Sequence, residues 1–227
     1  MYTALNSSNM LDYNFRISTP RLTLSHLDAN NERHVDFIYE LNNSPEILHI
    51  HRRMPGVRDT RDSARRFIEQ GTDAFEKIGY GRFLISLTPD AAAGGSGDDQ
   101  RAQSFSDSVN KHHLIGILSM RKDRFPSAPS VPDIGFAIMA KYYGRGYATE
   151  ASKALIKYYR EQKGQTAFAG YCDPDNENSI KMFRRLGFEE RGVKEVNGVI
   201  GDDVYLKCLV FTTGCEGDLD GMRDVSE

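Results

Sequence analysis

The sequence predicts a mixed α+β fold, with a central, mostly antiparallel sheet of about seven strands flanked by about four helices. Three observations support this prediction. Short strand-like runs occur in both halves of the chain. Four longer segments repeat apolar residues at helical spacing. A strand–helix–strand unit over residues 134–172 predicts a parallel crossover inside the sheet.

The first part of the chain predicts one strand followed by two helices. Residues 21–27 alternate apolar and polar side chains, as a half-buried strand does. The first helix repeats apolar positions at i, i+3, i+4 and i+7 on one face, and these are His34, Phe37, Ile38 and Leu41. The second helix takes Asp59 or Thr60 as its N-cap, and its inner face consists of Ala64, Phe67, Ile68, Gly71 and Phe75.

Two further strands are predicted at 83–88 and 114–120, and a long polar segment separates them. Residues 89–111 are rich in Ala, Gly, Ser and Asp. A connection of this length and composition predicts a flexible insertion that leaves the sheet intact.

The second half of the chain predicts four strands and two helices in alternation. Glycines follow both helices, as helix ends often require. In chain order, the predicted elements are a strand at 134–139, a helix at 147–163, a strand at 166–172, a helix at 176–186, and strands at 193–196 and 204–211. We therefore expect one domain at 16–212, with a flexible arm at 1–15 and a loose acidic tail at 213–227.

Composition excludes several classes of function. The chain carries 29 basic and 32 acidic residues, so its formal net charge is −3 and no global basic field favours nucleic acid or an anionic membrane. No apolar run approaches the roughly 18 residues of a membrane span. The three cysteines fit neither a disulfide framework nor a zinc motif, and the histidines lack ligands at metal spacing. We expect a cytoplasmic protein without a metal.

A glycine-containing turn lies between the strand at 134–139 and the helix that begins near Tyr147. Gly144 and Gly146 permit a tight turn, and a helix N-terminus presents unpaired N–H groups with a partial positive charge. Together they predict an anion site suited to a pyrophosphate. A turn without a ligand explains the same residues equally well. The P-loop and the dinucleotide fingerprint are excluded, because no Gly-Lys-Ser/Thr follows and Thr149 replaces the third glycine.

These residues resemble a known family. The run Ile134-Gly135-Phe136, followed by Tyr142-Tyr143-Gly144-Arg145-Gly146-Tyr147-Ala148-Thr149-Glu150-Ala151, is similar to the acetyl-coenzyme A motif of the GNAT N-acetyltransferases. Asn176-Glu177-Asn178-Ser179 and Phe183-Arg184-Arg185-Leu186-Gly187-Phe188 resemble the second cofactor segment of that family. Thr19-Pro20-Arg21-Leu22-Thr23-Leu24 resembles the opening strand of the ribosomal-protein N-terminal (Rim-type) branch.

The resemblance covers roughly residues 18–212 and implies a GNAT fold in which one parallel pair of strands splays apart. It implies acetyl-coenzyme A as cosubstrate and an N-acetyltransferase activity. By the resemblance, the cofactor-binding residues are Phe136, Ala137, Ile138, Met139, Tyr143, Gly144, Arg145, Gly146, Tyr147, Ala148, Thr149, Asn176, Ser179, Phe183 and Arg184.

The chain departs from the family at two positions. The family prefers Gln or Arg where Tyr143 stands, so side-chain help to the pyrophosphate is reduced. Many members carry a tyrosine as general acid where this chain has Phe183, which cannot donate a proton. We therefore keep a second hypothesis, a catalytically inactive coenzyme A-binding module, and a third, a nucleotide-binding protein.

Two residues are the candidates for catalysis of direct attack by a primary amine on the thioester. Asp133 precedes the central strand, where histone-acetylating relatives place a glutamate base, and a solvated residue after Pro132 is the alternative. Ser179 is the candidate for stabilising the departing thiolate, and a hydroxyl bonded to its own helix is the alternative.

The acceptor is predicted only by class. Glu46, between the first two helices, and Tyr205, on the last predicted strand, are the candidate substrate-binding residues. The expected partner is a small-molecule or peptide amine, with no nucleic acid and no membrane. Both a monomer and a homodimer remain open.

Overall fold

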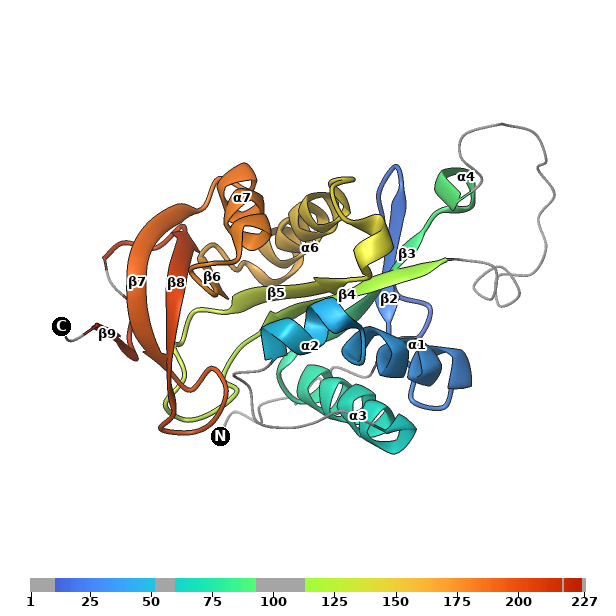
Figure 1. Ribbon diagram of the computed structural model, residues 1–227, viewed down its shortest axis with the longest axis horizontal. Helices are drawn as coiled ribbons and strands as arrows, with labels where there is room; N and C mark the ends of the chain where they lie inside the picture. Colours follow the sequence, from blue (N-terminus) through green and yellow to red (C-terminus); the bar gives the residue numbers. More distant parts are fainter. Residues whose placement is uncertain (1–10, 52–59, 93–112, 218, 226–227) are drawn as a thin grey trace, which may run out of the picture.

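A nine-stranded sheet runs through the computed structural model, with helices packed on both of its faces (Figure 1). The structure describes residues 11–51, 60–92, 113–217 and 219–225. The predicted α+β class, with its mostly antiparallel sheet, is confirmed.

The strands follow one another across the sheet in the order β1-β2-β3-β4-β5-β6-β8-β7-β9. Their bounds are β1 Arg16–Ser18, β2 Leu22–His26, β3 Arg82–Leu87, β4 Leu114–Arg121, β5 Asp133–Ile138, β6 Phe168–Cys172, β7 Glu189–Asn197, β8 Tyr205–Thr213 and β9 Met222–Asp224. Every neighbouring pair is antiparallel except β5 and β6.

The parallel pair parts almost as soon as it forms. Within the described residues, the ladder between β5 and β6 consists of Asp133 opposite Ala169. By contrast, β5 pairs with β4 from Asp133 to Ile138. One edge of β5 is therefore held by β4 over its length, while its other edge faces a widening gap toward β6. The splayed pair that the resemblance implied is present.

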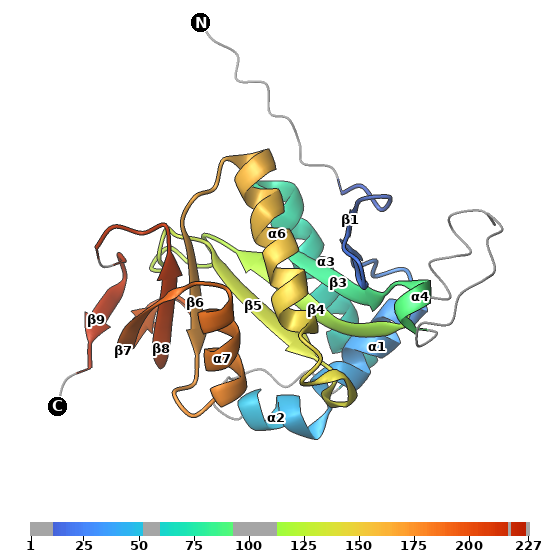
Figure 2. The same ribbon diagram turned by 90° about the horizontal axis from the view of Figure 1, so that it is seen from above.

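Helices cover the two faces of the sheet in separate groups (Figures 1 and 2). α6 Tyr147–Lys163 and α7 Glu177–Arg185 lie on one face. α1 Glu32–Asn42, α2 Pro45–His51 and α3 Arg61–Ile78 lie on the other. The short helix α4 Pro89–Ala92 follows β3.

Local capping explains where the long helices begin and end. Thr60 is the N-cap of α3, and it was one of the two N-caps predicted for this helix. Thr60 and Ser63 form a capping box, in which the side chain of each accepts a hydrogen bond from the backbone N–H of the other. Gly79 and Gly164 end α3 and α6 in the left-handed conformation, with φ of 76° and 64°. Asn176 caps α7 by accepting a hydrogen bond from the backbone of Ser179.

Each face of the sheet buries its own apolar core. Under α6 and α7 the core includes Phe83, Leu155, Tyr159 and Phe168, all 0% exposed. On the opposite face it includes Val35, Ile38, Leu41, Ala64 and Ile68. Full burial of one large apolar side chain is worth about 1.5–3 kcal/mol, so both helix layers are fixed firmly to the sheet.

The sheet has two more strands than predicted, and both are three-residue edge strands. β1 pairs with β2, and β9 pairs with β7. Strands this short carry too few alternating positions to stand out in a sequence. The predicted boundaries at 16 and 212 remain predictions, although Phe15 stacks on His26 and residues 222–224 join the sheet.

The predicted insertion at 89–111 falls mostly outside the described residues, with α4 at its start. Among the described residues, no helix is long and apolar enough to cross a membrane.

Candidate functional site

The glycine turn connects β5 to α6 through a short 3-10 helix, η1 Ala140–Tyr142. Gly144 and Gly146 adopt φ of 74° and 79°, a region that disfavours residues with a side chain. Gly146 is the N-cap of α6 and has no side chain to bond the first-turn amides. A helix N-terminus without a capping side chain presents free N–H donors and a partial positive charge, which suits an anion.

A polar clamp holds this turn against β2. The Glu150 carboxylate, in the first turn of α6, accepts hydrogen bonds from Thr19 Oγ1 at 2.6 Å and from the backbone N–H of Arg21 at 3.1 Å. It also pairs with the Arg21 guanidinium at 2.6 Å. Burial raises the pKa of Glu150, but the hydrogen bonds from Thr19 and Arg21 outweigh it and hold that pKa below its ordinary value of 4.5.

Arg21 also reaches the turn itself. Its Nη1 donates to the carbonyl of Arg145 at 3.0 Å, and its guanidinium lies 4.7 Å from the centre of the Tyr147 ring. These contacts fix the peptide between the two glycines. Sequence reasoning missed the roles of Arg21 and Glu150, although both lie inside the quoted motifs, because only the fold brings together residues 129 positions apart.

Aromatic rings fill the α7 side of the gap between β5 and β6. Phe183 is 1% exposed, stacks on Phe211 at 5.0 Å, and meets Phe136 edge-on at 6.3 Å. Its ring lies over Gly170 of β6, where a Cβ would come within 2.1 Å of it. Phe183 therefore belongs to the core beside the splayed strands, and its predicted contact with the cofactor remains a prediction.

The other predicted cofactor residues form three groups. Phe136, Ala137 and Ile138 lie on β5, and Met139 follows them, donating its N–H to Ile115 at 2.9 Å. Ala148 and Thr149 lie in the first turn of α6 beside the glycines. Arg184 lies on α7, where its guanidinium pairs with Glu190 at 2.7 Å.

Asn176 and Ser179 meet at the N-terminus of α7. Asn176 Oδ1 accepts from the Ser179 N–H at 3.1 Å, and Ser179 is buried. This hydrogen bond gives Asn176 a structural role as the N-cap of α7. The proposed role of Ser179 in catalysis remains a prediction.

Asp133 lies in a buried ion-pair cluster at the start of β5. Its side chain is 7% exposed, one oxygen lies 3.3 Å from Arg121, and the other bonds Arg124. Both oxygens of this carboxylate are engaged by guanidinium groups, so the side chain is held in one orientation. The geometry supports an ion-pair role, and the role of base remains a prediction.

The two candidate substrate residues lie in different places. Burial raises the pKa of Tyr143, and the Glu46 carboxylate of α2 raises it further, so Glu46 lies close to the glycine turn. Tyr205 lies at the start of β8 with the Arg223 guanidinium of β9 3.8 Å from its ring centre. Glu46 thus acts electrostatically on Tyr143 of the glycine turn, whereas Tyr205 contacts the edge strand β9.

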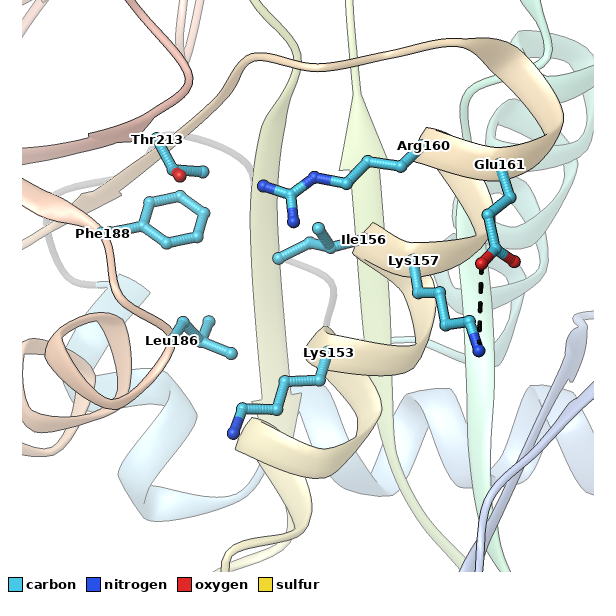
Figure 3. Close-up of a pocket in the computed structure, with 8 residues that line it drawn as sticks. All are labelled: Lys153, Ile156, Lys157, Arg160, Glu161, Leu186, Phe188 and Thr213. Atoms are coloured by element: carbon cyan, nitrogen blue, oxygen red, sulfur yellow. Dashed lines mark ion pairs between the residues drawn. The ribbon is translucent and has the colours of Figure 1, made fainter.

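A separate cavity of about 190 Å³ lies beside the middle of α6 (Figure 3). The view shows Arg160 and Ile156 directed from the helix toward Phe188. The residues that line the cavity are Lys153, Ile156, Lys157, Arg160, Glu161, Leu186, Phe188 and Thr213. None of these is a predicted site residue, so the cavity is distinct from the glycine turn. Among the described residues, no cluster of side chains is suited to a metal ion.

The sequence comparison decides the family. The model of the acetyltransferase (GNAT) domain matches residues 21–189. The chain belongs to the GNAT acetyltransferase family. Among curated proteins, 60 residues are 27% identical to the uncharacterized N-acetyltransferase YnaD of Bacillus subtilis (strain 168), over 26% of this chain and 35% of that protein. The match thus spans about a third of that relative's length.

Solved GNAT structures share the fold over nearly their whole length. The microcin C7 self-immunity acetyltransferase MccE, in complex with acetyl-CoA and AMP, has a TM-score of 0.61 and 19% identity, covering 87% of this chain and 94% of its own. The acetyltransferase that modifies the N-terminal serine of protein L7/L12 of the 50S ribosomal subunit, from Salmonella typhimurium, has a TM-score of 0.62 and 16% identity, covering 89% and 100%. At these identities the likeness shows the fold.

Proposed function

We propose that this GNAT chain transfers an acetyl group from acetyl-coenzyme A to a primary amine by direct attack in a ternary complex. One observation carries the proposal: the N-terminus of α6, which no side chain caps, follows the splayed strand β5 through η1 and the turn with Gly144 and Gly146. The amides bind a pyrophosphate, and the free edge of β5 bonds the pantetheine arm that leads into the gap.

The described residues fit acetyl-coenzyme A by their chemistry. Backbone amides of residues 145–148 are the pyrophosphate donors, and the edge of β5 that faces β6 supplies backbone partners for the amides of the arm. Tyr143, partly exposed beside the turn, adds a phenol but no charge. When bound, the cosubstrate supplies the thioester that the amine attacks.

The protein's own groups must deliver a neutral amine and stabilise the leaving thiolate. In this proposal Asp133 is the base, acting after one of its arginine contacts opens or through a bridging water, and Ser179 stabilises the thiolate. An α-amine titrates near about 8 and a lysine near about 10.4, so an α-amine needs less help from such a base.

The proposed acceptor is therefore a peptide or small-molecule amine, with Glu46 and Tyr205 as its candidate contacts. The Salmonella enzyme modifies a protein N-terminus, and the MccE structure holds the small molecule AMP with acetyl-CoA, so proteins of this fold bind both peptide and small-molecule partners. A cytoplasmic location, action as a monomer or homodimer, and independence from nucleic acids and membranes belong to the same proposal.

An inactive coenzyme A-binding module is the second candidate. Phe183 lacks the hydroxyl that many relatives use as an acid, and both oxygens of Asp133 are engaged. Such a module keeps the cofactor site and loses turnover.

Calorimetric titration tests the cofactor site shared by both candidates. Acetyl-coenzyme A is expected to bind, with ATP and NAD much weaker. Preference for ATP or NAD would instead support a nucleotide-binding protein. Thiol release in the presence of amines then separates the enzyme from the inactive module.

A further inference from the structure

The hydroxyl of Tyr171, on β6, is buried and has no hydrogen-bond partner among the described residues. The ring itself is partly exposed and packs against a small apolar cluster that includes Cys208 and Val210 of β8. The hydroxyl oxygen is therefore shielded from water, although part of the residue is exposed. A buried phenol without a partner loses its bonds to water and gains nothing in exchange, so it lowers the stability of the fold.

The position of Tyr171 connects this hydroxyl with the gap between β5 and β6. Asp133 stands opposite Ala169 at the single ladder pair, and Tyr171 lies two residues further along β6 on the same face. The intervening Gly170 faces the opposite side, where Phe183 covers it. Tyr171 thus lies on the face of the sheet away from Phe183, two residues beyond the point where the strands part.

The surroundings keep this phenol neutral. Burial raises the pKa of Tyr171 well above its ordinary value, the Asp133 carboxylate raises it further, and the Arg124 guanidinium opposes them. A neutral hydroxyl both donates and accepts a hydrogen bond. In a site shielded from water, such a bond is stronger than at the surface.

We propose that Tyr171 contacts the acceptor, and that its hydroxyl makes in the ternary complex the hydrogen bond it lacks here. This inference rests on the proposed acetyltransferase function and adds a residue to it. The phenol bonds a polar group next to the attacking amine and orients the nitrogen toward the thioester from the face opposite α6 and α7. The chain keeps a hydroxyl that weakens the fold because the acceptor needs it.

Two Tyr→Phe variants test the inference, because each removes one hydroxyl and leaves the ring. Tyr159 is the matched control: it is fully buried, and its hydroxyl donates to the carbonyl of Gly79 at 3.0 Å. Three quantities are measured for each full-length variant. They are the midpoint of thermal unfolding without ligand, the Kd of acetyl-coenzyme A, and kcat/KM for the amine that the wild type acetylates fastest.

Tyr171→Phe is expected to raise the unfolding midpoint by about 2–4 °C, since it removes an unbonded buried hydroxyl. It is expected to lower kcat/KM about tenfold or more while the Kd of acetyl-coenzyme A stays the same. Tyr159→Phe is expected to lower the unfolding midpoint and to leave kcat/KM unchanged.

The possible failures are distinguishable. A Tyr171→Phe variant that turns over as fast as the wild type, or that loses stability as Tyr159→Phe does, overturns the inference alone. A wild type that binds acetyl-coenzyme A but acetylates no amine overturns the proposed function, and the inference with it.

Discussion

The two ends of the proposed site are built in different ways. At the glycine turn, no side chain caps the N-terminus of α6, and a polar clamp from Thr19 and Arg21 to Glu150 holds the turn in place. Where β5 and β6 part, side chains form the walls: Phe183 on one face, and Asp133 and Tyr171 on the other.

This difference separates what is general from what is particular to this chain. A backbone-based cradle tolerates many side chains, so Tyr143 can replace Gln or Arg there without loss of the site. A wall of side chains changes its chemistry with each substitution. We therefore propose that the turn binds the cofactor, and that the side chains at the parting strands contribute to the choice of acceptor together with Glu46.

We expect the largest effect from a substitution in the glycine turn that weakens binding of acetyl-coenzyme A. Gly146→Glu adds a side chain at φ of 79° and puts a carboxylate among the amides meant for phosphate. Affinity for acetyl-coenzyme A, measured by calorimetry, should fall about 100-fold or more, or about 2.7 kcal/mol. Gly164→Glu is the matched control, because Gly164 has a similar φ of 64° at the far end of the same helix. It should keep wild-type affinity. Tight binding by Gly146→Glu would remove the turn from the cofactor site.

We expect the next largest effect from a substitution at the point where β5 and β6 part. Asp133→Asn leaves Arg121 and Arg124 facing a neutral amide in a mostly buried cluster, so the free energy of unfolding should fall by about 3 kcal/mol. If Asp133 is also the base, kcat falls more than cofactor affinity, most clearly at low pH. Chemical denaturation and pH–rate profiles measure the two effects separately. A destabilised variant with unchanged rates at every pH would leave Asp133 a structural role only.

We expect a smaller effect from removing the charge of Glu150, the carboxylate of the polar clamp. The Glu150 pKa is lowered in the folded chain, so its contribution to stability is complete above the ordinary value of 4.5 and is lost as pH falls through the folded pKa. Glu150→Gln should weaken cofactor binding about fivefold at neutral pH, by loosening the turn. In acid unfolding, the difference in stability between wild type and variant should shrink as the pH falls below 4.5 and through the lower folded pKa. A gap that stays constant through this range would show that the carboxylate charge is not what holds the turn.

The smallest effect concerns the acceptor near the turn. Glu46→Gln removes the carboxylate beside Tyr143 and should raise KM for a cationic amine about two- to threefold, with kcat unchanged. Steady-state kinetics on the preferred amine checks this. Glu40→Gln, an exposed carboxylate on α1, is the control and should leave KM unchanged.

Local patterns predicted the parts of the fold that local forces decide. The helix predicted at 147–163 has those bounds because Gly146 and Gly164 sit at its ends in left-handed conformations. The gap between β5 and β6 was expected only from the family resemblance. β1 and β9 were missed because their three residues form strands only when longer neighbours offer an edge.

For the site too, only the features formed by residues adjacent in the sequence could be predicted. The glycine turn is contiguous and could be found from spacing and residue type. The partners of Asp133 and Glu150 could not, because Arg124 and Arg21 reach them only after the chain has folded. The unbonded hydroxyl of Tyr171 has no sequence signal at all, since its meaning depends on burial.

Thiol release from acetyl-coenzyme A, followed with a panel of α-amino peptides, lysine side-chain analogues and small amines, tests whether the chain is an active N-acetyltransferase. We expect amine-dependent thiol release by the wild type, with an α-amine preferred, and none by Gly146→Glu. Tight binding of acetyl-coenzyme A with no release on any amine would contradict it and leave a binding module.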